Sequence, residues 1–219
     1  MGGRQLKKKV FELLSDKDFK KSISEISGFS ARVVVNPLFS FLYNSDELIK
    51  WRAITAMGVV VSNLADHDME SARVVMRRFI WNLNDESGGI GWGSPEAMGE
   101  IMARHEGLAK EYHKILLSYI MPDGNYIEHE ILQRGVLWGI GRLAHARPYL
   151  VKDFAHLLCT YMESPDPALR GLAVWTAGPY DCEVTNRLLK RLENDQATLT
   201  FYLDGTLEEL TVAQLRYRH

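Results

Sequence analysis

Two stretches of this sequence share one pattern: DELIKWRAITAMG at residues 46–58 and DPALRGLAVWTAG at residues 166–178. Each begins with an aspartate, continues as a short helical block and ends in small residues before a glycine. Related blocks end at two further glycines, which completes the series Gly58, Gly99, Gly141 and Gly178. A spacing of roughly 40 residues predicts an all-α solenoid of helix pairs, wound as a right-handed α-α superhelix.

The repeat array is expected over residues 32–194, as about four helix pairs and a final helix. Residues 1–31 precede it as an N-terminal helical cap, and residues 195–219 follow it as a β-hairpin and tail. Asp204 and Gly205 separate two strand-like runs, and an Asp-Gly pair in that place is typical of a type I′ turn. A solenoid needs its terminal core covered, so we interpret the hairpin as a C-terminal cap, with a binding edge strand as the alternative.

The composition is that of an ordinary folded protein, with 46% hydrophobic residues, 25% charged residues and a formal charge of −2. A protein that holds DNA through its phosphates usually has a basic excess, so nucleic acid is disfavoured as a partner. No apolar run approaches the roughly 20 residues that span a bilayer, and the N-terminus lacks the apolar core of a signal peptide. We expect a cytoplasmic protein without a membrane segment, in which Cys159 and Cys182 are buried thiols.

Aligning the blocks on their glycines assigns each residue of the second helices to a face. Residues nine, five and two positions before each glycine are apolar or small, and they are predicted to pack against the partner helix of each pair. One tryptophan of each block lies on the opposite side: Trp51, Trp92, Trp138 and Trp175. Two interpretations stay open, an exposed stripe on the concave surface or burial in the seams between repeats.

The block that ends at Gly99 departs from the other three. Four glycines between positions 88 and 93 prevent a stable helix there, and Ser94 is expected to cap the delayed helix with Pro95 at its first position. The segment is either a plain connection or a ligand-contacting loop. The candidate loop residues are Asp85, Gly88, Gly89 and Gly91.

Catalytic and metal-binding patterns are weak. Glu96 and Glu100 lie one helical turn apart and could form a carboxylate pair, although solvated acids at this spacing are common. The His-Glu dipeptides at His105 and His129 occupy unequal positions in the repeat, and the sequence has no HExxH or Cys/His ligand set. We therefore expect no catalytic residue, no metal ion and no cofactor. The candidate partner-binding residues are Trp51, Trp92, Glu96, Glu100, Arg134, Trp138, Arg142 and Trp175.

The blocks at residues 46–58 and 166–178 resemble the second helix of HEAT repeats, and most closely the short HEAT-like repeats of bilin lyases. The resemblance implies an armadillo-type fold. HEAT-like DNA glycosylases resemble the chain in their concave tryptophans and carboxylate. Deoxyhypusine hydroxylases resemble it in their His-Glu pairs, which here are out of register for a di-iron site.

The sequence favours a non-catalytic scaffold that binds a protein or peptide on its concave face, because tryptophan and arginine are good interface anchors. The alternative is a HEAT-like enzyme that acts on a nucleic acid, as a glycosylase does, or on a modified protein. In either case we expect the site beside the block that ends at Gly99, between Trp92, Glu96, Arg134 and Trp138.

Overall fold

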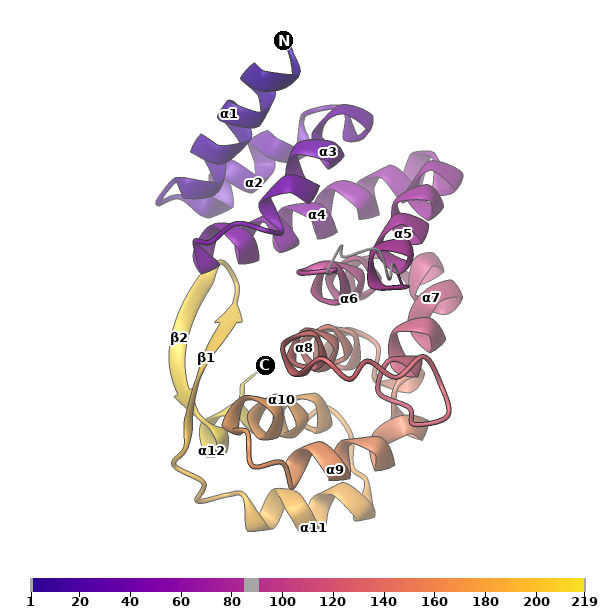
Figure 1. The fold of residues 1–219 in the computed structure, drawn as a ribbon, viewed down its shortest axis with the longest axis vertical. Helices are drawn as coiled ribbons and strands as arrows, with labels where there is room; N and C mark the ends of the chain where they lie inside the picture. Colours follow the sequence, from indigo (N-terminus) through magenta and orange to yellow (C-terminus); the bar gives the residue numbers. More distant parts are fainter. Residues whose placement is uncertain (1, 85–90, 219) are drawn as a thin grey trace.

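The computed structural model describes residues 2–84 and 91–218, which form an α-solenoid with a β-hairpin along one side (Figure 1). Two helices open the chain, α1 (Gly3–Ser15) and α2 (Phe19–Ser27). Three helix pairs follow: α3 (Ala31–Phe41) with α4 (Glu47–His67), α5 (Met69–Asn84) with α6 (Ser94–Arg104), and α7 (Glu106–Ser118) with α8 (Glu130–Ala146). The helical repeat architecture predicted from the glycine spacing is confirmed.

The first member of the fourth pair is not one continuous helix. Two 3-10 segments, Pro148–Leu150 and Lys152–Leu157, precede the short helix α9 (Leu158–Met162). Pro148 disfavours helical backbone at Arg147, which has φ −144° and ψ 65°, so the segment starts with a tight turn. The helices α10 (Pro167–Ala177) and α11 (Glu183–Arg191) end the array.

The second helices of consecutive repeats pack closely against one another, and α6, α8 and α10 are seen nearly end-on in Figure 1. A Cβ atom on Gly99 would lie 2.3 Å from the Cα of Gly139 in the next repeat, and the hydroxyl of Thr176 donates to the C=O of Leu137 across 3.1 Å. Gly139 and Thr176 therefore lie between the second helices of consecutive repeats. The sequence pattern predicted instead that they pack against the first helix of their own pair. A helix face without side chains permits this closer approach of two backbones.

The hairpin consists of β1 (Thr198–Leu203) and β2 (Thr206–Thr211), paired antiparallel. Its turn residues Asp204 and Gly205 have φ angles of 51° and 89°, as a type I′ turn requires, so the predicted turn is confirmed. The hairpin covers more than the last repeat. It runs from α10 and α12 (Val212–Leu215) at one end of the array to α4 at the other (Figure 1), where the guanidinium of Arg52 donates to the C=O of Gly205 across 3.3 Å.

The start of α6 lies one position away from the prediction. Gly93, with φ 72°, holds the capping position, because glycine adopts this left-handed backbone without strain. Ser94 is instead the first helical residue, and its buried hydroxyl has no hydrogen-bond partner among the described residues. Of the predicted loop residues, Gly91 is buried, while Asp85, Gly88 and Gly89 lie outside the described residues.

Helix α4 is long and apolar enough to cross a membrane by length and composition, which differs from the expectation of no such segment. Its most apolar window has a mean hydropathy of 1.2 and is 61% buried within the fold. A core helix of a globular protein meets the same criterion, so the finding is weak evidence for a membrane.

Candidate functional site

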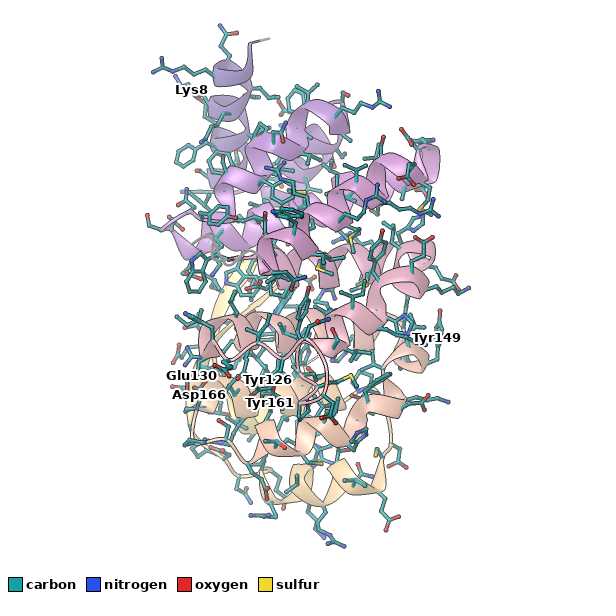
Figure 2. The ribbon with its side chains drawn as sticks, turned by 45° about the vertical axis from the view of Figure 1, so that its right-hand side comes forward. Lys8, Tyr126, Glu130, Tyr149, Tyr161 and Asp166 are labelled. Atoms are coloured by element: carbon teal, nitrogen blue, oxygen red, sulfur yellow. The ribbon has the colours of Figure 1, made fainter. Side chains whose placement is uncertain are left out.

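A pocket of about 510 Å³, here named the concave pocket, lies where the first turns of the second helices meet the hairpin. The starts of α8 and α10 are marked in Figure 2 by Glu130 and Asp166, which lie near one another. The lining residues come from all four second helices and both strands: Glu47, Lys50, Trp51, Glu96, Ile131, Arg134, Gly135, Trp138, Asp166, Pro167, Ala168, Leu172, Thr198, Leu199, Thr200, Phe201, Tyr202 and Leu207.

Aspartate caps fix the starts of α4 and α10, two of the four second helices that line the pocket. The carboxylate of Asp46 accepts from the N–H of Leu48 across 2.9 Å, and that of Asp166 accepts from the N–H of Ala168 across 3.0 Å. Such caps satisfy the free N–H groups of a first helical turn and determine where the helix begins. Side chains from the first turns of α4, α6, α8 and α10 all line the concave pocket.

The two cations of the concave pocket already have partners. Lys50 lies 3.3 Å from the carboxylate of Glu47, and the Nε of Arg134 donates to Asp166 across 2.8 Å. The side chain of Lys50 is only 14% exposed, so its pair is partly shielded from water. Both positive charges are thus compensated by acids of the pocket wall.

Glu96 is the acidic residue of the concave pocket that forms no ion pair with a described residue. Its side chain is buried, and its Oε2 atom has no hydrogen-bond partner among the described residues. Gly135 leaves room for the carboxyl group, since a Cβ atom there would lie 2.7 Å from it. Burial raises the pKa of Glu96, and the attraction of Lys50 offsets this only in part. The pocket therefore contains a carboxyl group with one oxygen, Oε2, whose hydrogen-bonding capacity is unused among the described residues.

The hairpin covers the aromatic residues of this side. The ring of Trp51 stacks on Tyr202 with centroids 5.1 Å apart, and it lies 4.7 Å from the ring of Trp138. The indole N–H of Trp138 donates to the C=O of Tyr202 across 3.1 Å. Trp138 is 2% exposed and Trp51 is half-buried. The tryptophans therefore do not form an open stripe, because β1 lies over them.

Trp175 is buried in a seam as well as under the hairpin. A Cβ atom on Gly141 in α8 would lie 2.4 Å from its ring, and Phe201 of β1 contacts its other side with centroids 4.8 Å apart. Trp175 is therefore buried between two repeats, as one of the two interpretations predicted. Trp51 and Trp138 are instead covered by the hairpin.

The remaining candidates lie outside the concave pocket. Trp92 is half-buried and makes an edge contact with His129, with centroids 5.2 Å apart. Glu100 accepts from Arg104 across 2.7 Å and from Arg142 across 2.6 Å, so it belongs to an ion-pair network rather than to a carboxylate pair with Glu96. Burial opposes the charged form of Glu100, but the two arginines outweigh it and lower its pKa.

Of the sequence candidates, the structure brings Trp51, Glu96, Arg134 and Trp138 together. Lys50 and Asp166 also line the pocket and were not predicted as site residues, whereas a binding edge in the hairpin was predicted only as the alternative to a cap. Asp166 could have been found, because its role as a helix cap places it at the start of α10. Among residues 2–84 and 91–218, no group of three His, Cys, Asp or Glu side chains is arranged to hold a metal ion.

Comparison with known proteins supports the fold. No family model matches the chain. An uncharacterized protein of Archaeoglobus fulgidus is 32% identical over 111 residues, which cover 49% of this chain and 52% of that protein, so the match spans about half of each. An engineered protein superposes with a TM-score of 0.51 at 12% identity, over 90% of this chain and 91% of its own. The designed armadillo repeat protein YIII(Dq)4CqI superposes with a TM-score of 0.50 at 13% identity, over 97% of each chain. These likenesses show an armadillo-type helical repeat fold and nothing of function.

Proposed function

We propose that this protein is a non-catalytic scaffold that binds a short protein or peptide segment in the concave pocket. The observation that carries the proposal is the buried carboxyl group of Glu96, whose Oε2 has no partner among the described residues, in the same pocket as the half-buried ring of Trp51. An unused polar group among aromatic side chains is typical of a binding site, where a few polar groups orient the ligand and apolar surface supplies affinity. The volume of about 510 Å³ is sufficient for one or two side chains of a bound segment.

The arrangement of the lining also favours a peptide over a polyanion. Lys50 and Arg134 are engaged by Glu47 and Asp166, so the described residues of the pocket offer no free cation for a phosphate. The exposed residues Thr198 and Thr200 of β1 lie at the rim, where an extended chain could run alongside the strand. From the pattern of residues 46–58 and 166–178 alone, we further propose a relationship to the short repeats of bilin lyases, and a cytoplasmic location.

A display library of random peptides tests the proposal. Peptides selected on the wild-type protein are measured against Ala168→Phe, which fills the concave pocket from α10, and against Ala146→Phe, an exposed position at the far end of α8. We expect at least tenfold weaker binding to Ala168→Phe and unchanged binding to Ala146→Phe. Equal affinities for both variants, with circular dichroism spectra like that of the wild type, would show that peptides do not use this pocket.

The second candidate is an enzyme that acts on a nucleic acid or a modified protein at the same pocket. It is favoured by one observation, the raised pKa of Glu96, since general acids are often carboxyl groups tuned in this way. Binding of single-stranded and duplex DNA at two salt concentrations tests the nucleic-acid form. A contact with phosphates predicts affinity that falls steeply with salt, and the absence of any salt-sensitive affinity excludes it.

A further inference from the structure

The strand β1 has an unpaired edge along the concave pocket. The two-residue turn makes Leu203 and Thr206 the first hydrogen-bonded pair, and hydrogen-bonded and non-hydrogen-bonded pairs then alternate along the register. The N–H and C=O groups of Thr198, Thr200 and Tyr202 consequently point away from β2. Tyr202 confirms this direction, because its C=O accepts from the indole of Trp138. Among the described residues the sheet has only these two strands, so the edge at Thr198 and Thr200 is open to a third.

One acidic side chain beside that edge has no ion-pair partner among the described residues. Five Lys, Arg, Asp or Glu side chains line the described part of the pocket, and two ion pairs, Lys50 with Glu47 and Arg134 with Asp166, account for four of them. Glu96 is the fifth, and it is buried without a partner for its Oε2 atom. An ionised Glu96 would require a counter-charge beyond the distant attraction of Lys50, so a cation complements this carboxylate. Trp51 lines the same pocket, and its ring already has the ammonium of Lys50 at 5.7 Å from its centroid, which is within the range of a cation–π contact.

We propose that the concave pocket binds an extended peptide, which adds as a third strand to the free edge of β1 and places one arginine or lysine side chain against Glu96. This inference rests on the proposed function and names its ligand. The hydrogen bond from Trp138 to Tyr202 ends the free edge, so the added strand runs beside Thr198–Phe201 and spans only a few residues. Main-chain hydrogen bonds supply affinity in this mode of recognition, and the side-chain pocket supplies specificity.

Ionisation of Glu96 is coupled to binding of the cation. The groups that face its carboxyl from the packed elements are Lys50 and Glu47 on α4, Arg134 on α8 and Asp166 on α10, while Glu100 on its own helix is neutralised by two arginines. Burial raises the pKa of Glu96, and a bound cation would lower it, so ionisation of the carboxyl and binding of the cation favour one another. Affinity is therefore expected to rise by up to tenfold per pH unit until Glu96 is ionised in the free protein.

The test uses a synthetic peptide of alternating threonine and valine with one central arginine, together with the same peptide carrying lysine or citrulline at that place. Citrulline has nearly the shape of arginine but no charge. We expect the arginine and lysine peptides to bind wild-type protein at least tenfold more tightly than the citrulline peptide. In Glu96→Gln, which keeps the shape of the side chain, the three peptides should bind equally. A thermal melt of the variant verifies that it is folded.

Two further probes test strand addition separately from recognition of the cation. The arginine peptide methylated on alternate backbone nitrogens should bind at least tenfold more weakly, because methylation removes the donors that β1 would accept. N-acetylarginine amide should bind far more weakly than the peptide. If it binds as tightly, the occupant is a small organic cation and strand addition is overturned.

The result that overturns cation recognition is equal binding of the arginine and citrulline peptides to the wild-type protein. If Ala168→Phe then abolishes both, the pocket still binds peptides and only this inference fails. If Ala168→Phe leaves the binding of both peptides unchanged, the proposed function fails as well.

Discussion

Replacing Gly99 with alanine tests whether close contact between second helices holds the repeat array together. A Cβ atom at this position would lie 2.3 Å from both the Cα and the carbonyl oxygen of Gly139. The obstacle is the backbone of α8, which cannot rotate aside as a flexible side chain could. The helices α6 and α8 must therefore move apart, and the contacts on both sides of them loosen.

The expected loss follows from two opposing effects. Overpacking a core typically costs about 1–3 kcal/mol, and a clash with backbone belongs at the upper end of that range. Alanine is favoured over glycine within a helix by about 1 kcal/mol. The free energy of unfolding of Gly99→Ala should therefore be about 2 kcal/mol lower than that of the wild type.

Urea unfolding, followed by circular dichroism and by tryptophan fluorescence, measures this change. With a denaturant dependence of about 2 kcal/mol per molar, the midpoint should fall by about 1 M urea. Gly3→Ala is the matched control, because no atom lies within 4 Å of its added Cβ, and its midpoint should stay close to that of the wild type. A midpoint for Gly99→Ala at or above the wild-type value would refute the close-contact explanation.

Three further changes probe the buried charges. Glu96→Gln should remove a loss of stability at higher pH. Because the pKa of the folded carboxyl is raised, the wild type loses stability as the pH rises from the ordinary pKa of 4.5 through the folded value. The melting temperatures of the two proteins should therefore agree at low pH and separate above it, and a constant difference across the pH range would contradict this. Glu100→Gln should cost about 3 kcal/mol in urea unfolding, because it removes the buried carboxylate that is the counter-charge of the half-buried Arg142. Here the lowered pKa makes the stabilising contribution present above pH 4.5 and lost as the pH falls through the folded value, so a variant as stable as the wild type at neutral pH would argue against it. Arg52→Met should release the tip of the hairpin and speed its limited proteolysis at residues 204–205, because the guanidinium donates to the C=O of Gly205; an unchanged cleavage rate would indicate that packing alone holds the tip.

Features that depend on neighbouring residues were predictable from the sequence. Asp46 and Asp166 cap helices because each carboxylate reaches an N–H two residues along the chain. Asp204 and Gly205 form a tight turn because both tolerate a positive φ. The capping position of α6 was predicted one residue too late, at Ser94 instead of Gly93. Serine and glycine both occur at helix starts, and the local pattern does not distinguish them.

The candidate site was predictable only in part. Counting along the helices places Trp51, Glu96 and Trp138 on one side, and the structure finds them together in the concave pocket. Glu100 has nearly the same register as Glu96, yet it is bound by two arginines, one of them 42 residues further along the chain. Such partners are set by the packing of separate repeats, which the helical period does not contain.

The sequence by itself determined the helix pairs, their caps, their repeat spacing and the hairpin turn, because each of these arises from interactions within a few residues. Only the tertiary structure decided where the hairpin lies. Arg52 bonds to Gly205 across a separation of 153 residues, and Trp138 bonds to Tyr202 across 64. These contacts lay β1 over the tryptophans and convert an open concave face into a pocket. Within this pocket, Glu96 is the acid that forms no ion pair with a described residue, and its Oε2 atom has no hydrogen-bond partner among them.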